Sequence, residues 1–319
     1  MSQLSNRLRS TLVQALTVVA VASGGLGQAM AETRTVESAY GPVQINGQPG
    51  RVVTLYEGAL DAALAVDANA VGAVITRGGS DVAEYIKSEA GDIAIVGAPA
   101  ETNIEAVIAA RPDLILAPPR INQQQVALLS RIAPVVASNV PMFQPDSWEQ
   151  ETRLFAKAMG REAEAEKVIG QVKERISEVA QVVSAKIPAG QRDAALVRWM
   201  PQGPLVMAEG LFSASLLQAV GFELTDKDLV KEGRPHSEPL SLENLSSMDQ
   251  SWVFLATLNE DGDKALDAAR KSPAFARLNA VQNDQVIGVS GQLWTSATGP
   301  LAALAILDDI EAAVNAIQP

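Results

Sequence analysis

The chain has 319 residues, no cysteine, and a net charge of −12 from 37 acidic and 25 basic side chains. This acidity argues against nucleic acid as a partner, because phosphates require a basic surface. The absence of cysteine removes disulfides and thiolate metal sites. With a single histidine, the chain also lacks the ligands from which structural zinc sites are built.

The first 31 residues have the pattern of an export signal. Arg7 and Arg9 form a short basic region, a mostly apolar run follows from Leu12 to Ala22, and Ala29-Met30-Ala31 supplies the small-x-small cleavage pattern. The apolar run is too short to span a bilayer. We therefore expect residues 1–31 to be a cleaved signal peptide and the mature protein to lie beyond the inner membrane. Without cysteine, no residue is available to carry a lipid anchor.

Residues 32–145 predict an N-terminal α/β lobe, because short apolar runs alternate with helical patterns. The predicted strands cover residues 51–55, 71–75, 93–96, 114–117 and 135–137. The predicted helices cover residues 57–66, 80–90, 103–110 and 123–132. The strands are continuously apolar, which is typical of a parallel sheet with helices on both faces.

Residues 146–188 predict a long connecting helix. The segment begins with the capping pattern Ser147-x-x-Gln150 and breaks at Gly160. From Val168 to Ile187, apolar residues recur at intervals of three and four. The amphipathic helix that this pattern predicts begins at about Glu162, and its about 25 residues would be roughly 38 Å long at about 1.5 Å per residue. A single stiff helix between two lobes predicts little domain motion.

Residues 189–319 resume the α/β alternation and predict a C-terminal lobe. The predicted strands cover residues 194–198, 252–256 and 286–289. The predicted helices cover residues 212–220, 242–248, 261–269 and 300–317. The fold expected from the pattern is therefore two α/β lobes joined by one long helix.

The two predicted lobes share a local pattern. Asn103-Ile104-Glu105 and Ser241-Leu242-Glu243 each open a short predicted helix, and a strand begins nine residues after each glutamate. Either glutamate alone is explained by the helix dipole, which favours an acidic side chain in the first turn. The occurrence of both, at corresponding places in two lobes, favours a shared role.

The segment from Val96 to Ile115 resembles the N-lobe signature of the helical-backbone substrate-binding proteins, which serve importers of ferric siderophores, haem and cobalamin. The resemblance extends over residues 51–57, Leu129–Pro134, the long helix, Val197-Arg198-Trp199 and the Glu243 segment, and so over essentially the whole mature chain. Ferric-citrate-type binders look most similar. The resemblance implies two Rossmann-like lobes in the class III periplasmic binding protein fold. It also implies a periplasmic monomer without catalytic activity or cofactor.

The partner that the resemblance implies is the permease dimer of an inner-membrane ABC importer. In that family, one acidic side chain on each lobe docks onto arginines of the two permease subunits, and Glu105 and Glu243 are the matching residues. Exposed pairs of this kind contribute about 0–1 kcal/mol each. They would therefore fix register and encounter rate more than affinity.

Ligand contacts are expected at the carboxyl ends of the strands, where open α/β sheets bind ligands. The candidates are Tyr56, Arg77, Arg120, Arg198, Trp199 and Trp294. Guanidinium groups bind carboxylates bidentately, so the arginines suit an anionic ferric chelate whose iron stays with its chelator. For the arginines, the alternative is that they are ordinary loop residues with solvated head groups. For Trp294, the alternative is that it covers the final helix instead of lining the cleft.

The sequence offers little for an enzyme or for another class of ligand. The chain has no Gly-x-Ser-x-Gly or His-Glu-x-x-His motif, and its one histidine, His236, lies in a proline-rich loop where we expect it to be solvated. A haem- or cobalamin-binding protein of the same fold remains the alternative, since a Tyr56 phenolate is able to ligate haem iron. Aromatic residues make up only 4% of the chain, which counts against a haem pocket.

Overall fold

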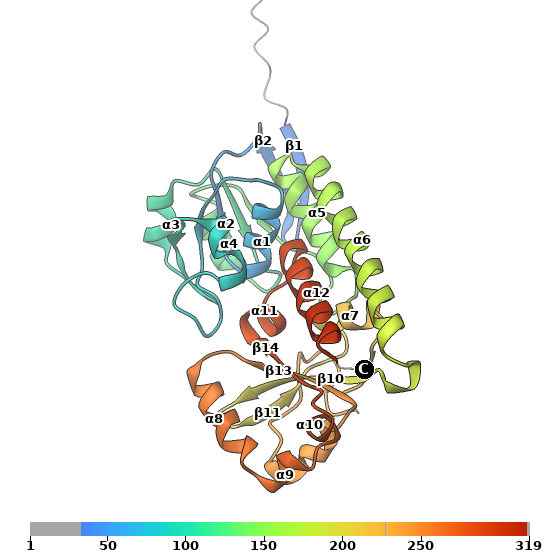
Figure 1. Ribbon diagram of the computed structural model, residues 1–319. Coiled ribbons are helices and arrows are strands. Elements are labelled where there is room, and N and C mark those ends of the chain that lie inside the picture. The colour runs from blue at the N-terminus through green and yellow to red at the C-terminus, as the bar shows by residue number, and fades with distance from the viewer. Residues whose placement is uncertain (1–32, 227, 318–319) are drawn as a thin grey trace, which may run out of the picture.

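The computed structural model describes residues 33–226 and 228–317, so the expected signal peptide lies outside the described residues. The chain opens with an antiparallel hairpin, β1 (Thr33–Ser38) and β2 (Gly41–Asn46). Two α/β lobes follow, one above the other in Figure 1. The two-lobed α/β fold expected from the sequence is confirmed.

The N-terminal lobe is built on a five-stranded sheet in the order β5-β4-β3-β8-β9, with all neighbouring strands parallel. The strands are β3 (Val52–Thr54), β4 (Ala70–Ala73), β5 (Ala94–Ile95), β8 (Leu114–Ala117) and β9 (Val135–Ala137). Leu114 and Leu116 pack against helices on one face, and Ile115 packs against helices on the other. Continuous apolar strands are therefore buried on both sides, as expected for a parallel sheet.

The helices of this lobe are mostly short. α1 (Glu57–Ala65) covers one face of the sheet together with the later α5, and α3 (Ile104–Ala110) and α4 (Gln123–Leu129) cover the other. The remaining elements are η1 (Glu84–Ile86), α2 (Lys87–Ala90), β6 (Gly97–Ala98) and β7 (Glu101–Thr102).

Two helices connect the lobes. α5 (Ser147–Met159) ends at Gly160, whose φ of +67° is a backbone conformation that glycine adopts readily. α6 (Glu162–Lys186) then runs 25 residues from the upper lobe to the lower one. Ala165 belongs to the N-terminal core, whereas Val172 and Val183 belong to the C-terminal core. One helix is thus shared between the two cores.

The C-terminal lobe is built around β10 (Asp193–Met200), which lies between β11 (Gly203–Val206) and β13 (Trp252–Thr257), with β14 (Val286–Ser290) beyond β13. The inner face of this sheet packs on α6 and on the next set of helices, α7 (Phe212–Ala219), α11 (Gly291–Ser296) and α12 (Pro300–Asn315). The outer face packs on η3 (Leu242–Met248), α8 (Glu260–Arg270), α9 (Pro273–Ala276) and α10 (Asn279–Gln282). The short β12 (Glu223–Leu224) and η2 (Ala189–Gln191) complete the lobe.

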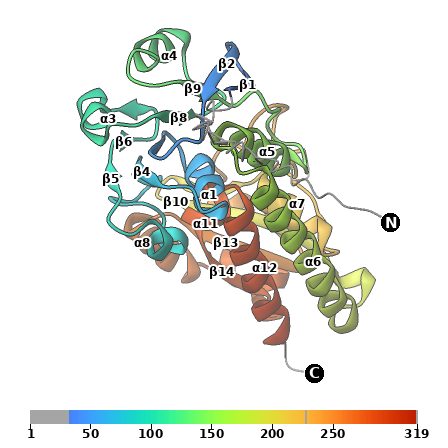
Figure 2. The same cartoon turned by 90° about the horizontal axis from the view of Figure 1, so that it is seen from above.

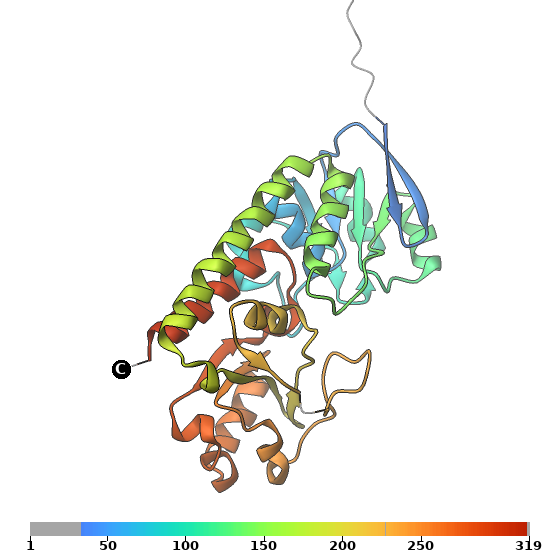
Figure 3. The ribbon, with the colours of Figure 1, turned by 90° about the vertical axis from the view of Figure 1, so that its right-hand side faces the viewer.

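The last helix, α12, is part of the C-terminal sequence but lies between the lobes. It packs along α6 and also contacts α1 of the N-terminal lobe. Figures 2 and 3 show α12 and α6 side by side. No helix among the described residues is long and apolar enough to cross a membrane.

The inner face of the C-terminal sheet depends on a cluster of aromatic rings. Phe254 is 0% exposed, stacks on Trp294 with ring centroids 5.2 Å apart, and meets Phe222 edge-on at 5.5 Å. We expect Phe254→Ala to lower the free energy of unfolding by about 3–5 kcal/mol, the usual cost of an aromatic deletion in a core. Chemical denaturation measures this loss. The exposed Leu242→Ala is the control, and an equal effect of both changes would contradict this account.

Candidate ligand-binding site

Arg198 lies near the carboxyl end of the central strand of the C-terminal sheet. Its backbone pairs with Leu205 of β11 on one side and Ala256 of β13 on the other. Side chains alternate along a strand, so Arg198 points to the same face as Leu196. Leu196 packs in the inner core, and that face is turned toward the N-terminal lobe in Figure 1.

The Arg198 side chain is mostly buried and makes no hydrogen bond or ion pair with another described residue. The residue is 5% exposed, and its Nε makes no hydrogen bond. Among the described residues, no carboxylate forms an ion pair with it. Burial lowers the pKa of Arg198, and the nearby positive charge of Arg77 lowers it further. Burying a cation of this kind costs free energy of folding unless a negative charge pairs with it.

Arg77 belongs to the other lobe and is exposed, in the loop that follows β4. The carboxylate of Glu57, at the start of α1, accepts hydrogen bonds from the Thr76 hydroxyl and from the Arg77 backbone N–H, the latter at 3.0 Å. Burial raises the pKa of Glu57, while Thr76 and Arg77 act in the opposite direction. Glu57 therefore fixes the backbone from which the Arg77 side chain projects.

The loop that carries Arg77 touches the C-terminal lobe. A Cβ placed on Gly78 would come within 3.2 Å of the Leu258 side chain, just beyond β13. A Cβ on Gly79 would come within 3.1 Å of Gln292 in α11. The structure thus brings Arg77 and Arg198 together from opposite lobes, at a place where the lobes are already in contact.

Arg120 follows β8 and is exposed. β8 is the neighbour of β3 in the parallel sheet, so Arg120 and Tyr56 leave the sheet at the same edge. No contact joins Arg120 to Arg77 or Arg198 among the described residues.

Tyr56 does not present its hydroxyl to the arginine pair. The ring packs edge-on against Phe155 of α5 with centroids 6.2 Å apart, and the hydroxyl is buried near the Glu151 carboxylate. Burial raises the pKa of Tyr56 well above its usual value, and the buried Glu151 carboxylate adds to this. The phenol therefore stays protonated at neutral pH, whereas ligation of haem iron by tyrosine uses the phenolate.

Two tryptophans expected to wall the site are core residues instead. Trp199 is 2% exposed and packs on Phe275 of the outer face, because it alternates with Arg198 along β10. Trp294 lies in α11 rather than in a loop, is fully buried, and donates from Nε1 to Asp309 at 2.8 Å. Neither ring is accessible to a ligand, and both expectations were wrong.

Glu105 and Glu243 are exposed, one on each lobe. Glu105 lies in the first turn of α3, where Asn103 caps the helix by accepting from the Ala106 N–H at 3.0 Å. Glu243 lies in the first turn of η3. Neither carboxylate pairs with another described residue by an ion pair. Both are therefore free to meet a basic partner surface.

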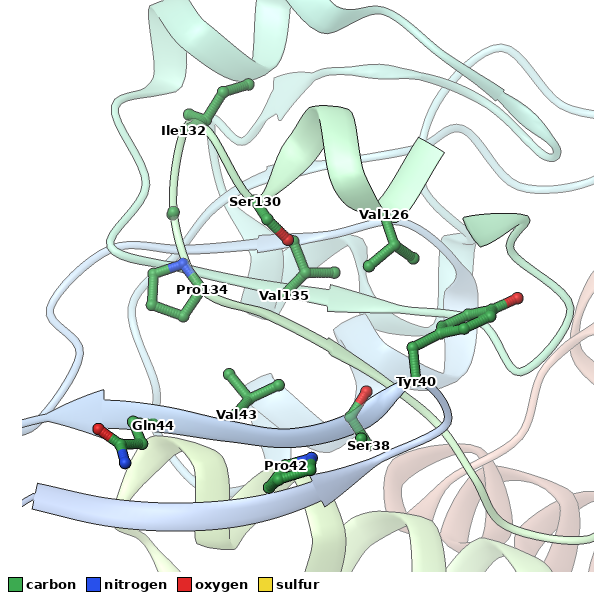
Figure 4. Close-up of a pocket in the computed structure, with 12 residues that line it drawn as sticks. Ser38, Tyr40, Pro42, Val43, Gln44, Val126, Ser130, Ile132, Pro134 and Val135 are labelled. Carbon is green, nitrogen blue, oxygen red and sulfur yellow. The ribbon is translucent and has the colours of Figure 1, made fainter. Parts of the chain in front are cut away.

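Two cavities lie away from the arginine pair. One of about 490 Å³ opens between the β1–β2 hairpin and the α4–β9 segment, where Figure 4 shows Tyr40, Ser130 and Val135 among its lining residues. Its lining contains no charged side chain, so it is poorly suited to an anion. The other, of about 220 Å³, lies beside α8 and is lined by Asp263, Asp267 and Arg270 among others. The described residues contain no cluster of three metal-ligating side chains.

The sequence places Glu57 at a strand end, as it does the arginines, but does not predict that Glu57 and Thr76 position the Arg77 loop. Glu57 is one of many acidic residues in a first helical turn, and Thr76 carries no motif. The only signal for either was proximity along the chain to a strand end. Their joint role appears once the loop after β4 is placed beside α1.

The protein-family model described as "Periplasmic binding protein" matches residues 52–293 of the chain. A probable siderophore-binding lipoprotein of Bacillus subtilis, YfiY, is 27% identical over 290 residues, covering 88% of this chain and 87% of the relative. The Fe(3+) dicitrate-binding periplasmic protein FecB of Escherichia coli is 24% identical and covers 86% and 88%. The crystal structure of Staphylococcus aureus SirA complexed with staphyloferrin B matches with a TM-score of 0.77 and 28% identity, covering 89% of this chain and 99% of SirA.

The burial of an unpaired guanidinium makes a prediction about stability. Arg198→Met keeps much of the side-chain volume and removes the buried charge, so we expect the free energy of unfolding to rise by about 1 kcal/mol or more. Urea denaturation of the ligand-free protein measures the change. Arg153→Met is the control, since Arg153 is ion-paired with Glu149 and Glu166 at the surface and should gain nothing. A less stable Arg198→Met protein would show that the charge is balanced within the fold.

Proposed function

The chain belongs to the periplasmic binding protein family, and we propose that it captures a ferric siderophore between its two lobes and delivers it to an inner-membrane ABC importer. It is a substrate-binding protein rather than an enzyme. The proposed ligand is an anionic chelate with oxygen donors, of the ferric citrate kind. The iron is cargo, and its coordination sphere is filled by the chelator.

The observation that carries this proposal is Arg198, which is mostly buried, has no counter-charge, and lies near enough to Arg77 of the other lobe for the charge of Arg77 to act on it. Arginine presents a planar fork of donors that matches a carboxylate bidentately. Two guanidinium groups from opposite lobes would bind two carboxylates of one chelate, or the two oxygens of a single carboxylate. Relatives named for ferric dicitrate and for siderophores support this ligand class.

Electrostatics would make the binding favourable without a large movement of the lobes. In the free protein burial lowers the pKa of Arg198, and repulsion from the positive charge of Arg77 lowers it further. An anion between them replaces this repulsion by two attractions in a site where burial weakens solvent screening. The fold has already buried Nε of Arg198 and fixed the Arg77 loop through Glu57. Less ordering is therefore left for the ligand to induce.

Haem is the weaker alternative. The buried Tyr56 phenol, with its raised pKa, is unsuited to ligating iron as a phenolate at neutral pH. No single feature of the described residues favours cobalamin.

Delivery would use the exposed carboxylates of Glu105 and Glu243. Each lobe offers one carboxylate from a first helical turn, and each would meet an arginine of one permease subunit. Exposed hydrophobic side chains lie close by in sequence, Ile108 beside the first and Leu242 beside the second. We propose that the protein acts as a free periplasmic monomer.

The ligand site is tested by Arg198→Ala. We expect the dissociation constant for ferric citrate to rise about tenfold or more, because a hydrogen bond between charged groups contributes about 1.5–3 kcal/mol. Titration by fluorescence quenching, against a panel that includes other ferric chelates, haem and cobalamin, measures this and identifies the ligand. Arg277→Ala, at an exposed position of the C-terminal lobe, is the matched control. Unchanged affinity across the panel for the Arg198 variant would remove this residue from the site.

The docking residues are tested by the double change Glu105→Ala with Glu243→Ala. We expect uptake of the iron chelate by cells to be abolished while the purified variant binds ligand with its original affinity. The control replaces two other exposed acids, Glu101 and Glu260, one on each lobe. Uptake at the original rate in the Glu105 and Glu243 variant would defeat the docking assignment.

A further inference from the structure

One buried carboxylate joins the two lobes. Asp61 lies in the middle of α1, in a run that is otherwise mostly alanine and leucine, and is 0% exposed. Its Oδ1 accepts the backbone N–H of Leu301 at 2.9 Å, and its Oδ2 accepts that of Ala302 at 2.8 Å. The Tyr85 hydroxyl donates to Oδ2 at 2.9 Å. All three partners are donors, so both oxygens of the carboxylate are hydrogen-bonded.

Leu301 and Ala302 form the first turn of α12, where backbone N–H groups have no partner within the helix. Helices usually satisfy these groups with a Ser, Thr, Asp or Asn immediately before the first turn. Here that position is Gly299, which has no side chain to offer. A residue about 240 positions away in the sequence, on the other lobe, supplies the cap instead.

The surfaces that meet at this cap are shaped for close approach. Gly299 has a φ of +127°, and a Cβ there would overlap the Asp61 carboxylate. A Cβ on Gly58 of α1 would overlap the methyl group of Thr298. Glycine on both sides therefore allows the start of α12 to sit directly on α1. Such a contact has little tolerance for sliding.

Placing a carboxylate here has an electrostatic cost. Burial raises the pKa of Asp61 to about 7, against the three hydrogen bonds that favour its ionised form. A local cap at position 299 would satisfy the same N–H groups without burying an acid in the N-terminal lobe. The arrangement therefore does more than cap the first turn of α12.

We propose that Asp61 is a latch that fixes the relative position of the two lobes by holding the start of α12 against α1. Farther along α12, Ile306, Ile310 and Val314 pack in the core of the C-terminal lobe. α12 is thus a second strut beside α6, as Figures 2 and 3 show. A single helix permits twisting about its axis, whereas two struts anchored in both lobes resist it. This inference does not depend on which ligand is bound.

The first test needs no substitution. Hydrogen exchange measured by NMR should show the amide protons of Leu301 and Ala302 protected about as strongly as the core of the protein. The amide of Ala163, exposed in the first turn of α6 where no side chain caps the helix, provides the internal comparison and should exchange far faster. Equal, fast exchange at all three amides would overturn the latch.

The second test measures the lobes directly. The chain has no cysteine, so Gln124→Cys and Ala276→Cys place one spin label on each lobe at exposed positions. Pulsed electron–electron double resonance on the full chain should give a narrow distance distribution, which Asp61→Asn should broaden, with exchange at Leu301 and Ala302 at least about tenfold faster. Asp309→Asn, which removes a carboxylate bonded within the C-terminal lobe, should leave the distribution narrow.

The outcomes separate a latch from a merely structural acid. If Asp61→Asn lowers stability while the distance distribution stays narrow, Asp61 only stabilises the fold and the proposal fails. If that variant does not fold, Tyr85→Phe removes one of the three donors and is the milder substitute. It should accelerate exchange at Ala302 without affecting Ala163, and an unchanged rate at Ala302 would count against the latch.

Discussion

A guanidinium group inside a protein, with no carboxylate beside it, is the feature on which the rest of this structure depends. Arg198 occupies a position in the centre of a sheet where an apolar residue would be expected. Packed aromatic rings cover both faces of the sheet that carries it. Aromatic rings of Phe254 and Trp294 fill the inner face of the sheet, and Trp199 with Phe275 fills the outer one. Departures from the rules of stable packing that persist in this way are typical of functional sites.

The remaining parts of the site position the positive charge of Arg77 near that of Arg198. Glu57 holds the backbone at Thr76 and Arg77, and the glycines after Arg77 let the loop approach the C-terminal lobe closely. The second cation thus comes from the opposite lobe and is held by groups of its own lobe. Recognition would then rest on charges positioned in advance, rather than on closure of two mobile halves around a ligand.

Much of the fold was predictable because it rests on local patterns. The runs Leu114–Ala117 and Val135–Ala137 are strands with the predicted bounds, and α6 follows the three- and four-residue periodicity from Glu162 onward. The β1–β2 hairpin was missed, since polar and apolar residues mix in it without a clear run. The sequence predicts no helix around Trp294, because a six-residue helix leaves too short a pattern to detect.

The site was harder to predict for physical reasons. Strand ends mark where arginines emerge, but only the alternation of side chains decides which neighbour faces inward, and it separates Arg198 from Trp199. The latch at Asp61 joins residues about 240 positions apart, and nothing near Asp61 in the sequence identifies its partners. A lone acid within an apolar helical run was the one visible trace.

The sharing of α6 between two cores has a consequence for how the protein unfolds. Ala165 is part of one core and Val172 of the other, within two helical turns of each other. Unfolding of this helix would remove packing contacts from both cores at the same time. We therefore expect the two halves to be coupled in unfolding, although each has a sheet of its own.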